Sequence, residues 1–450
     1  MSLRKLWRFK MEGIRKIDLI NLVLQVDTNY DRSILDLDIW QDYLDCLCGD
    51  REYQKEAIKT TLIYLLSHKY SSINDLVIEN YKKNDDIKIE YLSEVQYLKS
   101  LQFPNMWSGV IDLATGTGKS YVIFGIAHIM LLLGVIKKVL VLCPSLTIER
   151  ELNKKFSELI ARENLHITIP MQFRNVSFRI TNANQTVMQN DICIENIHAV
   201  YSTTGSSISD SFSRKGKDTL ILSDEVHHAY NSSSDTDIRK WKSFILNPEY
   251  EFRYHIGFTG TAYRDDNYFN DVIYRYSLRQ AIDEKAVKNI NYVDEDVSDG
   301  DYEKFQKIYQ NHIKNKIKYS SIKPLSIIVT SDIASAKNLC EDFVDFLIEY
   351  TNEDRDTIEK KVLIVTSHKD HKENITKLLN IDDKDDYTEW IISVSMLTEG
   401  WDVKNVFQIV PWENRAFNSK LLISQVLGRG LRIPESFSFQ PSVRVFNHSS

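Results

Sequence analysis

The stretch Ala114-Thr-Gly-Thr-Gly-Lys-Ser120 decides how the rest of this 450-residue chain is interpreted. An apolar run over 109–113 precedes it, and a long apolar segment of helical character follows over 119–134. The sequence therefore predicts a buried strand, a glycine-rich turn and a helix in direct succession. Glycines let the turn curl so that its N–H groups face inward, and the start of the helix adds a partial positive charge. Such a turn is suited to binding phosphate.

The side chains of this turn have separate expected roles. Lys119 is expected to reach the β- and γ-phosphates of a nucleotide, and the Ser120 hydroxyl is expected to hold Mg²⁺. The rest of the loop would contact the phosphates through its backbone, at Thr115, Gly116, Thr117 and Gly118. The strict pattern has a glycine six residues before the lysine, where this chain has Leu113. An ordinary glycine-rich turn is the alternative, and the strand before and helix after make it the weaker interpretation.

Strand and helix patterns alternate on both halves of the chain. Apolar runs at 139–143 and 219–222 continue the first series, with a helical stretch at 146–162. A second series of strand-like runs follows a linker at 277–323, at 326–330, 362–366, 390–394, 406–410 and 443–446. Strands alternating with helices predict parallel sheets, so the expected fold is α/β with two tandem lobes. We place the lobes at 51–280, with a possible insertion at 70–106, and 281–450, behind a helical N-terminal segment at 1–50.

Composition excludes several classes of protein. Hydrophobic residues make up 43% and charged residues 26%, as in globular proteins that are neither fibrous nor disordered. Five cysteines without a Cys-x-x-Cys pair indicate a reducing compartment with neither a disulfide framework nor a structural zinc. No apolar run is long enough to span a bilayer, so we expect a cytoplasmic protein. The net charge of −7 argues, as a bulk number, against a nucleic-acid partner, but local patches leave that question open.

Two adjacent carboxylates end another apolar run. Asp224 and Glu225 close the segment Leu220-Ile-Leu-Ser-Asp-Glu-Val-His-His228. A nucleotide-hydrolysing site needs one carboxylate for Mg²⁺, the role we assign to Asp224, and another to activate the attacking water, the role we assign to Glu225. A helix cap is the alternative for this pair taken alone. The histidines suggest zinc, but the chain offers no matching ligand spacing.

In this order the motifs resemble those of superfamily 2 helicases and translocases of the DEAH-like kind, over residues 51–434. Tyr53 and Gln54 resemble the adenine-recognition motif, and Ser145 stands in a motif that touches the nucleic-acid backbone. The resemblance gives His227 a place in the DEAH-type box and implies that Thr259 and Thr261 couple hydrolysis to lobe movement. It also implies that the two lobes are RecA-like. Thr203 and Thr204 are weaker candidates for backbone contacts.

The second half carries two further motifs of the resemblance. Ser395–Asp402 is similar to the fifth motif, in which Thr398 would contact nucleic acid and Gly400 and Asp402 would contact the nucleotide. The segment Gln425-Val-Leu-Gly-Arg-Gly-Leu-Arg432 is similar to the sixth motif. Residues three or four apart share a helix face, so Gln425, Arg429 and Arg432 can point across the cleft together. Two guanidiniums there can neutralise charge on a γ-phosphate as arginine fingers.

Within the superfamily, the second-half motifs look most like the restriction-type branch, which includes the motor (Res) subunit of type III restriction enzymes and related bacterial defence helicases. This resemblance implies an ATP- and Mg²⁺-dependent DNA translocase or helicase of a restriction or phage-defence system. Its partners would be duplex or single-stranded DNA and a methyltransferase or nuclease subunit or domain. We find no nuclease constellation and expect the chain to be the motor core of a longer protein. The alternatives are an RNA helicase and a nucleotide-gated sensor that binds nucleic acid without moving along it.

Overall fold

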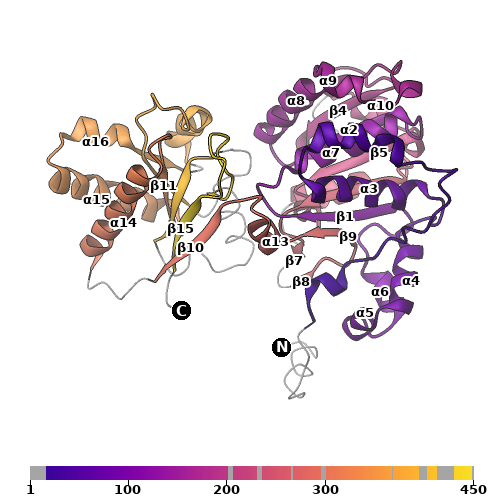
Figure 1. Cartoon of the computed structure of the whole chain (residues 1–450), viewed down its shortest axis with the longest axis horizontal. Coiled ribbons are helices and arrows are strands. Elements are labelled where there is room, and N and C mark those ends of the chain that lie inside the picture. The colour runs from indigo at the N-terminus through magenta and orange to yellow at the C-terminus, as the bar shows by residue number, and fades with distance from the viewer. Residues whose placement is uncertain are drawn as a thin grey trace.

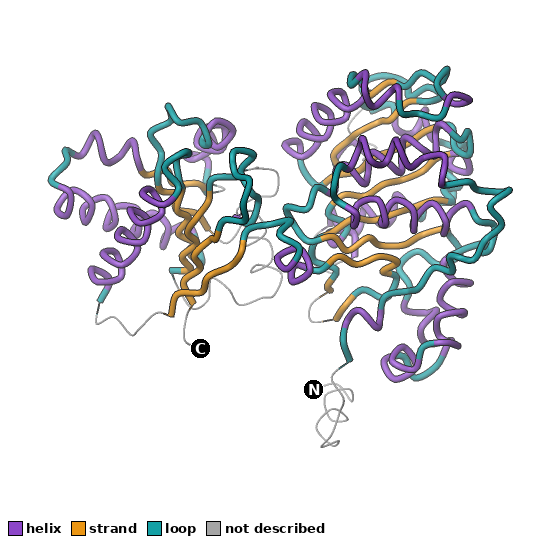
Figure 2. Tube along the Cα trace, in the orientation of Figure 1, coloured by secondary structure: helices purple, strands orange, loops and turns teal. Residues whose placement is uncertain are grey.

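The computed structural model describes residues 17–200, 206–230, 236–264, 267–294, 300–366, 368–394, 403–412 and 430–447. The chain forms two α/β lobes lying side by side, joined through the segment around helix α13 (Leu278–Asp283) (Figure 1). Helices lie over the strands of each sheet (Figure 2). The predicted fold class, two tandem RecA-like lobes with a small helical N-terminal segment, is confirmed by this architecture.

The first lobe is built on a seven-stranded parallel sheet in the order β3-β4-β2-β5-β6-β1-β9. Its strands are β1 (Trp107–Leu113), β2 (Lys138–Cys143), β3 (Arg179–Thr181), β4 (Asp191–Asn196), β5 (Thr219–Asp224), β6 (Tyr254–Thr259) and β9 (Val272–Tyr276). A two-stranded antiparallel hairpin, β7 (Tyr263–Arg264) and β8 (Asn267–Tyr268), lies outside it. The central strands are buried along almost their whole length, since parallel sheets are covered on both faces.

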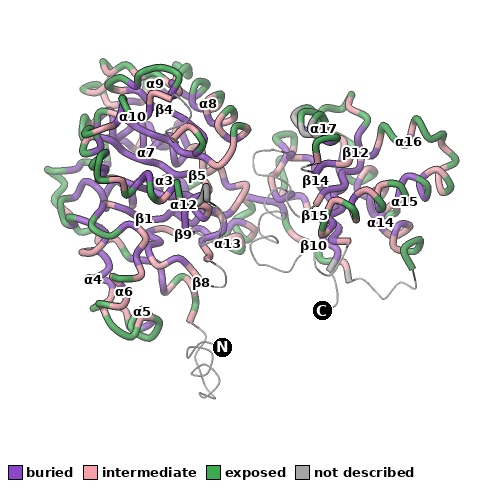
Figure 3. Tube along the Cα trace, turned by 180° about the vertical axis from the view of Figure 1, so that it is seen from behind, coloured by how far each residue is buried: buried purple, intermediate pink, exposed green. Residues whose placement is uncertain are grey.

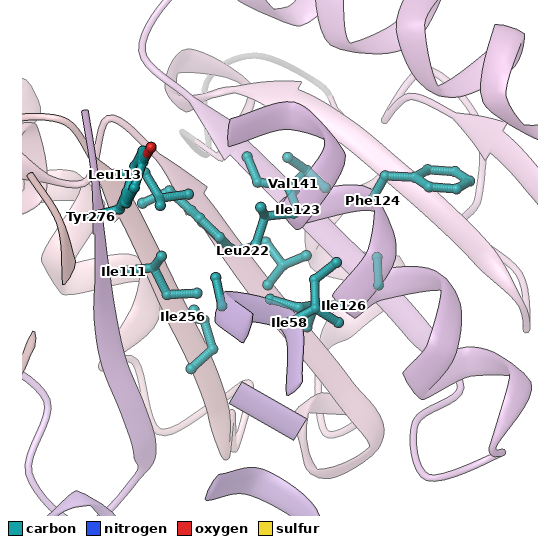
Figure 4. Packing of buried hydrophobic residues seen from close by; sticks show 14 of the residues in the cluster. Ile58, Ile111, Leu113, Ile123, Phe124, Ile126, Val141, Leu222, Ile256 and Tyr276 are labelled. Carbon is teal, nitrogen blue, oxygen red and sulfur yellow. The ribbon is translucent and has the colours of Figure 1, made fainter. Parts of the chain in front are cut away.

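Alternate strand residues pack on opposite faces of this sheet. One face meets helices α3 (Glu52–Leu66) and α7 (Lys119–Leu132), where Ile58 and Ile123 contact strand residues such as Ile111 and Leu222 (Figure 4). The opposite face packs Val110 and residues of β2 and β5 against another set of helices. The other helices of the lobe that adjoin the sheet are α8 (Leu146–Ile160), α9 (Glu163–Ile167), α10 (Ile208–Phe212), α11 (His227–Tyr230) and α12 (Thr236–Ile245).

The described N-terminal residues are part of the first lobe. Helix α2 (Gln41–Cys48) buries Tyr43, Leu44 and Leu47 in the core shared with α3 and α7. The backbone N–H of Leu24 donates to the carbonyl of Val272, which ties the segment before α2 to the edge strand β9. Residues 70–106 contribute no strand and form the helices α4 (Ile73–Lys83), α5 (Asp85–Glu90) and α6 (Glu94–Ser100) beside that edge (Figure 1).

The second lobe has a six-stranded parallel sheet in the order β10-β15-β14-β11-β13-β12. Its strands are β10 (Asn289–Asp294), β11 (Leu325–Thr330), β12 (Val362–Val365), β13 (Trp390–Val394), β14 (Val406–Pro411) and β15 (Ser442–Asn447). Its helices are α14 (Asp301–Lys318), α15 (Ile333–Thr351), α16 (Arg355–Lys361) and α17 (Lys372–Lys377). Buried residues concentrate in the strands of both lobes, and exposed residues in the outer helices and loops (Figure 3).

The connection between the lobes differs from the prediction in one respect. We predicted a linker over 277–323, but β10 already pairs with β15 in the second sheet. The first strand of the second sheet thus begins at Asn289, within the predicted linker and shortly after residue 281, where we placed the start of the second lobe. Short 3₁₀ helices complete the described elements, at Leu19–Leu22, Asp38–Trp40, Met171–Phe173, Ile197–Val200, Gly216–Asp218, Lys369–His371 and Leu378–Asn380. Among the described residues, no helix combines the length and apolar character needed to cross a bilayer.

Candidate functional site

The candidate site lies where three neighbouring strands of the first lobe end. Strands β5, β6 and β1 are adjacent and parallel, so their carboxyl ends meet at one edge of the sheet. Asp224 ends β5, Thr259 ends β6, and the glycine-rich loop follows β1. Open α/β sheets bind their ligands at this edge. The fold therefore brings together three motifs that are far apart in the sequence.

The glycine-rich loop has the backbone that its sequence predicted. Gly116 and Gly118 have φ angles of 87° and 80°, in the left-handed region that side chains disfavour. A Cβ atom on Gly118 would lie 2.7 Å from Nε2 of Gln54, so glycine is needed for space as well as for backbone conformation. Helix α7 begins directly afterwards at Lys119, and its free N–H groups are available for an anion.

Lys119 and Glu225 form an ion pair at the centre of the site. Nζ of Lys119 lies 2.6 Å from Oε1 of Glu225, and the two side chains are only 11% and 19% exposed. Burial lowers the pKa of Lys119, but the charges of Glu225 and Asp224 outweigh burial, and the pKa is raised. Glu225 has a φ of 50°, a strained conformation for a residue with a side chain. Such strain is typical of functional positions.

A chain of polar contacts connects Glu225 to the end of β6. Nδ1 of His227 lies 3.4 Å from Oε2 of Glu225 and 3.0 Å from Oγ1 of Thr259. The same nitrogen lies 3.5 Å from Oγ1 of Thr261. The side chains of His227, Thr259 and Thr261 are all buried, so a buried polar path joins Glu225 to the loop after β6.

The loop after β6 also packs directly on the glycine-rich loop. A Cβ atom on Gly260 would lie 2.6 Å from Oγ1 of Thr115 and 3.0 Å from its backbone nitrogen. Close approach without a side chain is what allows the two loops to touch. The two threonines expected to couple hydrolysis to lobe movement thus flank a glycine that packs on the glycine-rich loop, and both lie near His227, which contacts Glu225.

Tyr53 and Gln54, at the start of α3, are tied to the same loop. The Tyr53 hydroxyl donates to the carbonyl of Thr117 at 2.9 Å, and Nε2 of Gln54 donates to it at 2.7 Å. Oε1 of Gln54 is buried and has no hydrogen-bond partner among the described residues. A buried acceptor without a partner is costly, so this oxygen suits a bound group with an N–H donor.

Tyr53 has an aromatic partner that no sequence pattern predicted. Tyr276, at the end of β9, stacks on the Tyr53 ring with centroids 3.9 Å apart and an interplanar angle of 7°. Its hydroxyl donates to Glu284 in the segment that leads to the second lobe, at 2.8 Å. A tyrosine at a strand end carries no distinctive pattern, and only the order of the strands brings it to α3.

Of the site residues that we predicted in the second lobe, Arg432 lies among the described residues and the others do not. Arg432 is described, and its positive charge acts on Lys119, where it opposes the rise in pKa that Glu225 and Asp224 cause. The predicted site residues Thr398, Gly400, Asp402, Gln425 and Arg429 lie outside the described residues, as do Thr203 and Thr204. Ser145 is half-buried and caps helix α8, where its Oγ accepts from the N–H of Ile148 at 3.4 Å.

The fold and the site are those of a P-loop protein with two RecA-like lobes. Residues 48–264 match the family described as "Type III restriction enzyme, res subunit". This part of the chain is therefore similar to the motor subunits of restriction enzymes, in agreement with the resemblance of its motifs. None of the curated proteins compared with the chain matches it.

Solved structures share the fold at low sequence identity. A fragment described as an HsdR subunit of a type I restriction enzyme from Vibrio vulnificus YJ016 is 19% identical, with a TM-score of 0.50, and the match covers 89% of this chain and 68% of that one. The type ISP restriction-modification enzyme LlaBIII bound to DNA is 13% identical, with a TM-score of 0.49, and the match covers 88% of this chain and 28% of that one. Dbp5 of S. cerevisiae, bound to RNA and ADP BeF3, is 12% identical, with a TM-score of 0.45, 85% of this chain and 88% of that one. The chain thus spans less than a third of LlaBIII.

Proposed function

We propose that the protein is a nucleic-acid-dependent ATPase that moves along DNA as the motor of a bacterial restriction or phage-defence system. The observation that carries the proposal is the Lys119–Glu225 pair at the carboxyl edge, between the glycine-rich loop and the end of β5. The relation of residues 48–264 to restriction-enzyme motor subunits supports the choice of DNA. A methyltransferase or nuclease, on another chain or domain, would be its partner in the cytoplasm.

The residues of the first lobe fit ATP and Mg²⁺. Oε1 of Gln54, the buried acceptor without a partner, can accept from the adenine amine, and Tyr53 fixes the loop that carries the phosphates. Lys119 would exchange Glu225 for the β- and γ-phosphates, and Ser120 and Asp224 would hold Mg²⁺. Bound Mg²⁺ supplies positive charge that neutralises the phosphates as the terminal bond breaks.

Release of Glu225 from Lys119 gives the carboxylate its second role. A free Glu225 can accept a proton from the attacking water, while Arg429 and Arg432 neutralise charge on the γ-phosphate. His227, Thr259 and Thr261 would transmit the carboxylate's movement to the β6 loop, because they form a continuous contact chain. Gln425, Gly400 and Asp402 would complete the nucleotide site from the second lobe.

Nucleic acid would lie across the two lobes and be held at its phosphates, through contacts such as Ser145 and Thr398. Phosphate contacts make binding largely independent of sequence and sensitive to salt. The net charge of −7 fits a motor that holds its track weakly and in an ATP-dependent manner.

The test compares ATPase activity with duplex DNA, single-stranded DNA and RNA, together with displacement of a DNA triplex. We expect DNA to stimulate turnover and ATP to drive displacement. Lys119→Ala should abolish both, whereas Lys137→Ala, which removes an exposed lysine paired with Asp218, should change neither. Stimulation by RNA alone would favour an RNA helicase, and turnover without displacement would favour a sensor. Full turnover in Lys119→Ala would overturn the site.

A further inference from the structure

Lys288 occupies an unusual position at the start of the second lobe. It lies between helix α13 and strand β10, and it is 0% exposed. Its Nζ donates to three backbone carbonyls, those of Lys404 and Val406 at 2.7 Å and of Gly430 at 2.9 Å. An ammonium group has three N–H donors, so all of them are used on main-chain oxygens.

The three acceptors stand next to the second-lobe motifs. Lys404 and Val406 follow the fifth motif, which ends at Asp402, and Gly430 stands between Arg429 and Arg432 in the sixth. The backbone N–H of Lys288 also donates to the carbonyl of Leu431, at 2.7 Å. One residue thus holds the chain after the fifth motif and the chain within the sixth motif at fixed positions relative to each other.

The same turn is held from its other side by a carboxylate. Asp382 accepts from the backbone N–H groups of Lys404 and Asn405, at 2.8 and 3.0 Å. Burial lowers the pKa of Lys288 well below its ordinary value, and the charge of Asp382 opposes that shift. The face of the Phe407 ring, 4.3 Å from Nζ, adds a favourable contact for the cation.

Burying a lysine amino group is seldom the best way to stabilise a fold, because apolar residues of the same volume usually stabilise it as well. The expense is understandable where several loops must keep one arrangement, since a buried polar group that is fully hydrogen-bonded specifies a single geometry. Here the loops include the segment that carries Arg432, whose positive charge acts on Lys119.

We propose that Lys288 is a positioning residue for ATP hydrolysis. It would set the orientation of the segment that carries Arg432 by binding carbonyl groups just after the fifth motif and within the sixth. The proposal rests on the proposed function, because it assumes that Arg432 acts on the γ-phosphate. Lys288 itself would touch neither nucleotide nor water.

The experiment is a double-mutant cycle on DNA-stimulated ATPase with Lys288→Met, Arg432→Ala and both together. Each protein is checked for native circular dichroism at the assay temperature, and ATP affinity is measured with a fluorescent ATP analogue. Lys288→Met should lower kcat at least tenfold and leave the ATP Kd within threefold, because the first-lobe site is intact. The kcat of the double variant should be within twofold of the kcat of Arg432→Ala. A residue that acts only by positioning Arg432 has no further effect on kcat once that arginine is removed.

A control and a second variant keep the test decisive. Lys360→Met removes an exposed lysine paired with Asp356 on α16 and should leave kcat unchanged. If Lys288→Met does not fold, Asp382→Asn, which weakens the hold on the same turn, should still lower kcat at least threefold at unchanged Kd. The inference is overturned if kcat of Lys288→Met stays within twofold of the wild type, if the two losses multiply, or if Asp382→Asn, used in its place, leaves kcat unchanged. Full activity of Arg432→Ala would instead overturn the proposed function.

Discussion

Replacing Glu225 by glutamine should separate ATP binding from ATP hydrolysis. In the structure the Glu225 carboxylate holds Lys119 at 2.6 Å, with both side chains mostly shielded from water. ATP has to take Lys119 away from this carboxylate, and the same carboxylate is the proposed base for the attacking water. Glu225→Gln is therefore expected to tighten binding and to abolish turnover.

The size of the binding effect follows from the hydrogen bond that is weakened. A hydrogen bond to a charged group contributes about 1.5–3 kcal/mol. The glutamine oxygen can still accept from the charged Lys119, so the substitution moves this bond from the upper end of the range to the lower end. The two ends of the range differ by about 1.5 kcal/mol, which corresponds to roughly tenfold tighter ATP binding. Loss of a general base lowers kcat by about 100-fold or more.

The assay is a titration with a fluorescent ATP analogue, followed by steady-state ATPase measurements with and without DNA. Glu79→Gln makes the same chemical change at an ion pair with Lys83 on α4, away from the site, and should alter neither quantity. An ATP Kd that is unchanged or weaker in Glu225→Gln would show that the carboxylate does not compete for Lys119. A kcat within tenfold of the wild type would refute its role as the base.

Two further predictions rest on single contacts, and a third rests on the burial of a carboxyl group. Gly118→Ala should weaken ATP binding at least tenfold in the same titration, because the new Cβ would lie 2.7 Å from Nε2 of Gln54 at a φ of 80°. Thr259→Val removes the hydroxyl that contacts Nδ1 of His227 at 3.0 Å, and it should reduce stimulation of the ATPase by DNA at least fivefold with ATP Kd unchanged. Burial raises the pKa of Glu195 from 4.5 to about 7, so the folded state retains a proton that the unfolded chain loses. Stability should therefore fall as pH rises from about 4.5 to 7, and Glu195→Gln should flatten that dependence of Tm.

Strand positions were largely predictable from the sequence. The predicted runs in the second lobe and at β1, β2 and β5 agree with the observed strands to within two residues at each end. The reason is that parallel strands covered on both faces appear as unbroken apolar runs. Strands that contain polar residues were not predicted. Strand β4 contains Asp191, Glu195 and Asn196, and the residues of β10 were assigned to the linker. In β4 the polar groups are satisfied by contacts from distant segments, such as the Ala183 N–H to Glu195.

The candidate site divides in the same way. Motif spacing named Lys119, Asp224 and Glu225 and assigned them to one site, because the carboxyl ends of parallel strands share an edge. The order β5-β6-β1, which places Thr259 between the two loops, is a property of the sheet and cannot be read from the chain.

By itself, then, the sequence determined which residues are candidates for binding phosphate, for binding metal and for acting as a general base. It also determined that these residues would meet in an α/β fold. Local patterns carry that information, since each motif occupies a few consecutive residues. Only the tertiary structure decided that Tyr276 stacks on Tyr53, that Lys119 is held by Glu225, and that Lys288 binds three main-chain oxygens from two other segments. Each of these contacts joins residues more than a hundred positions apart, and the path of the chain through the sheets brings them together.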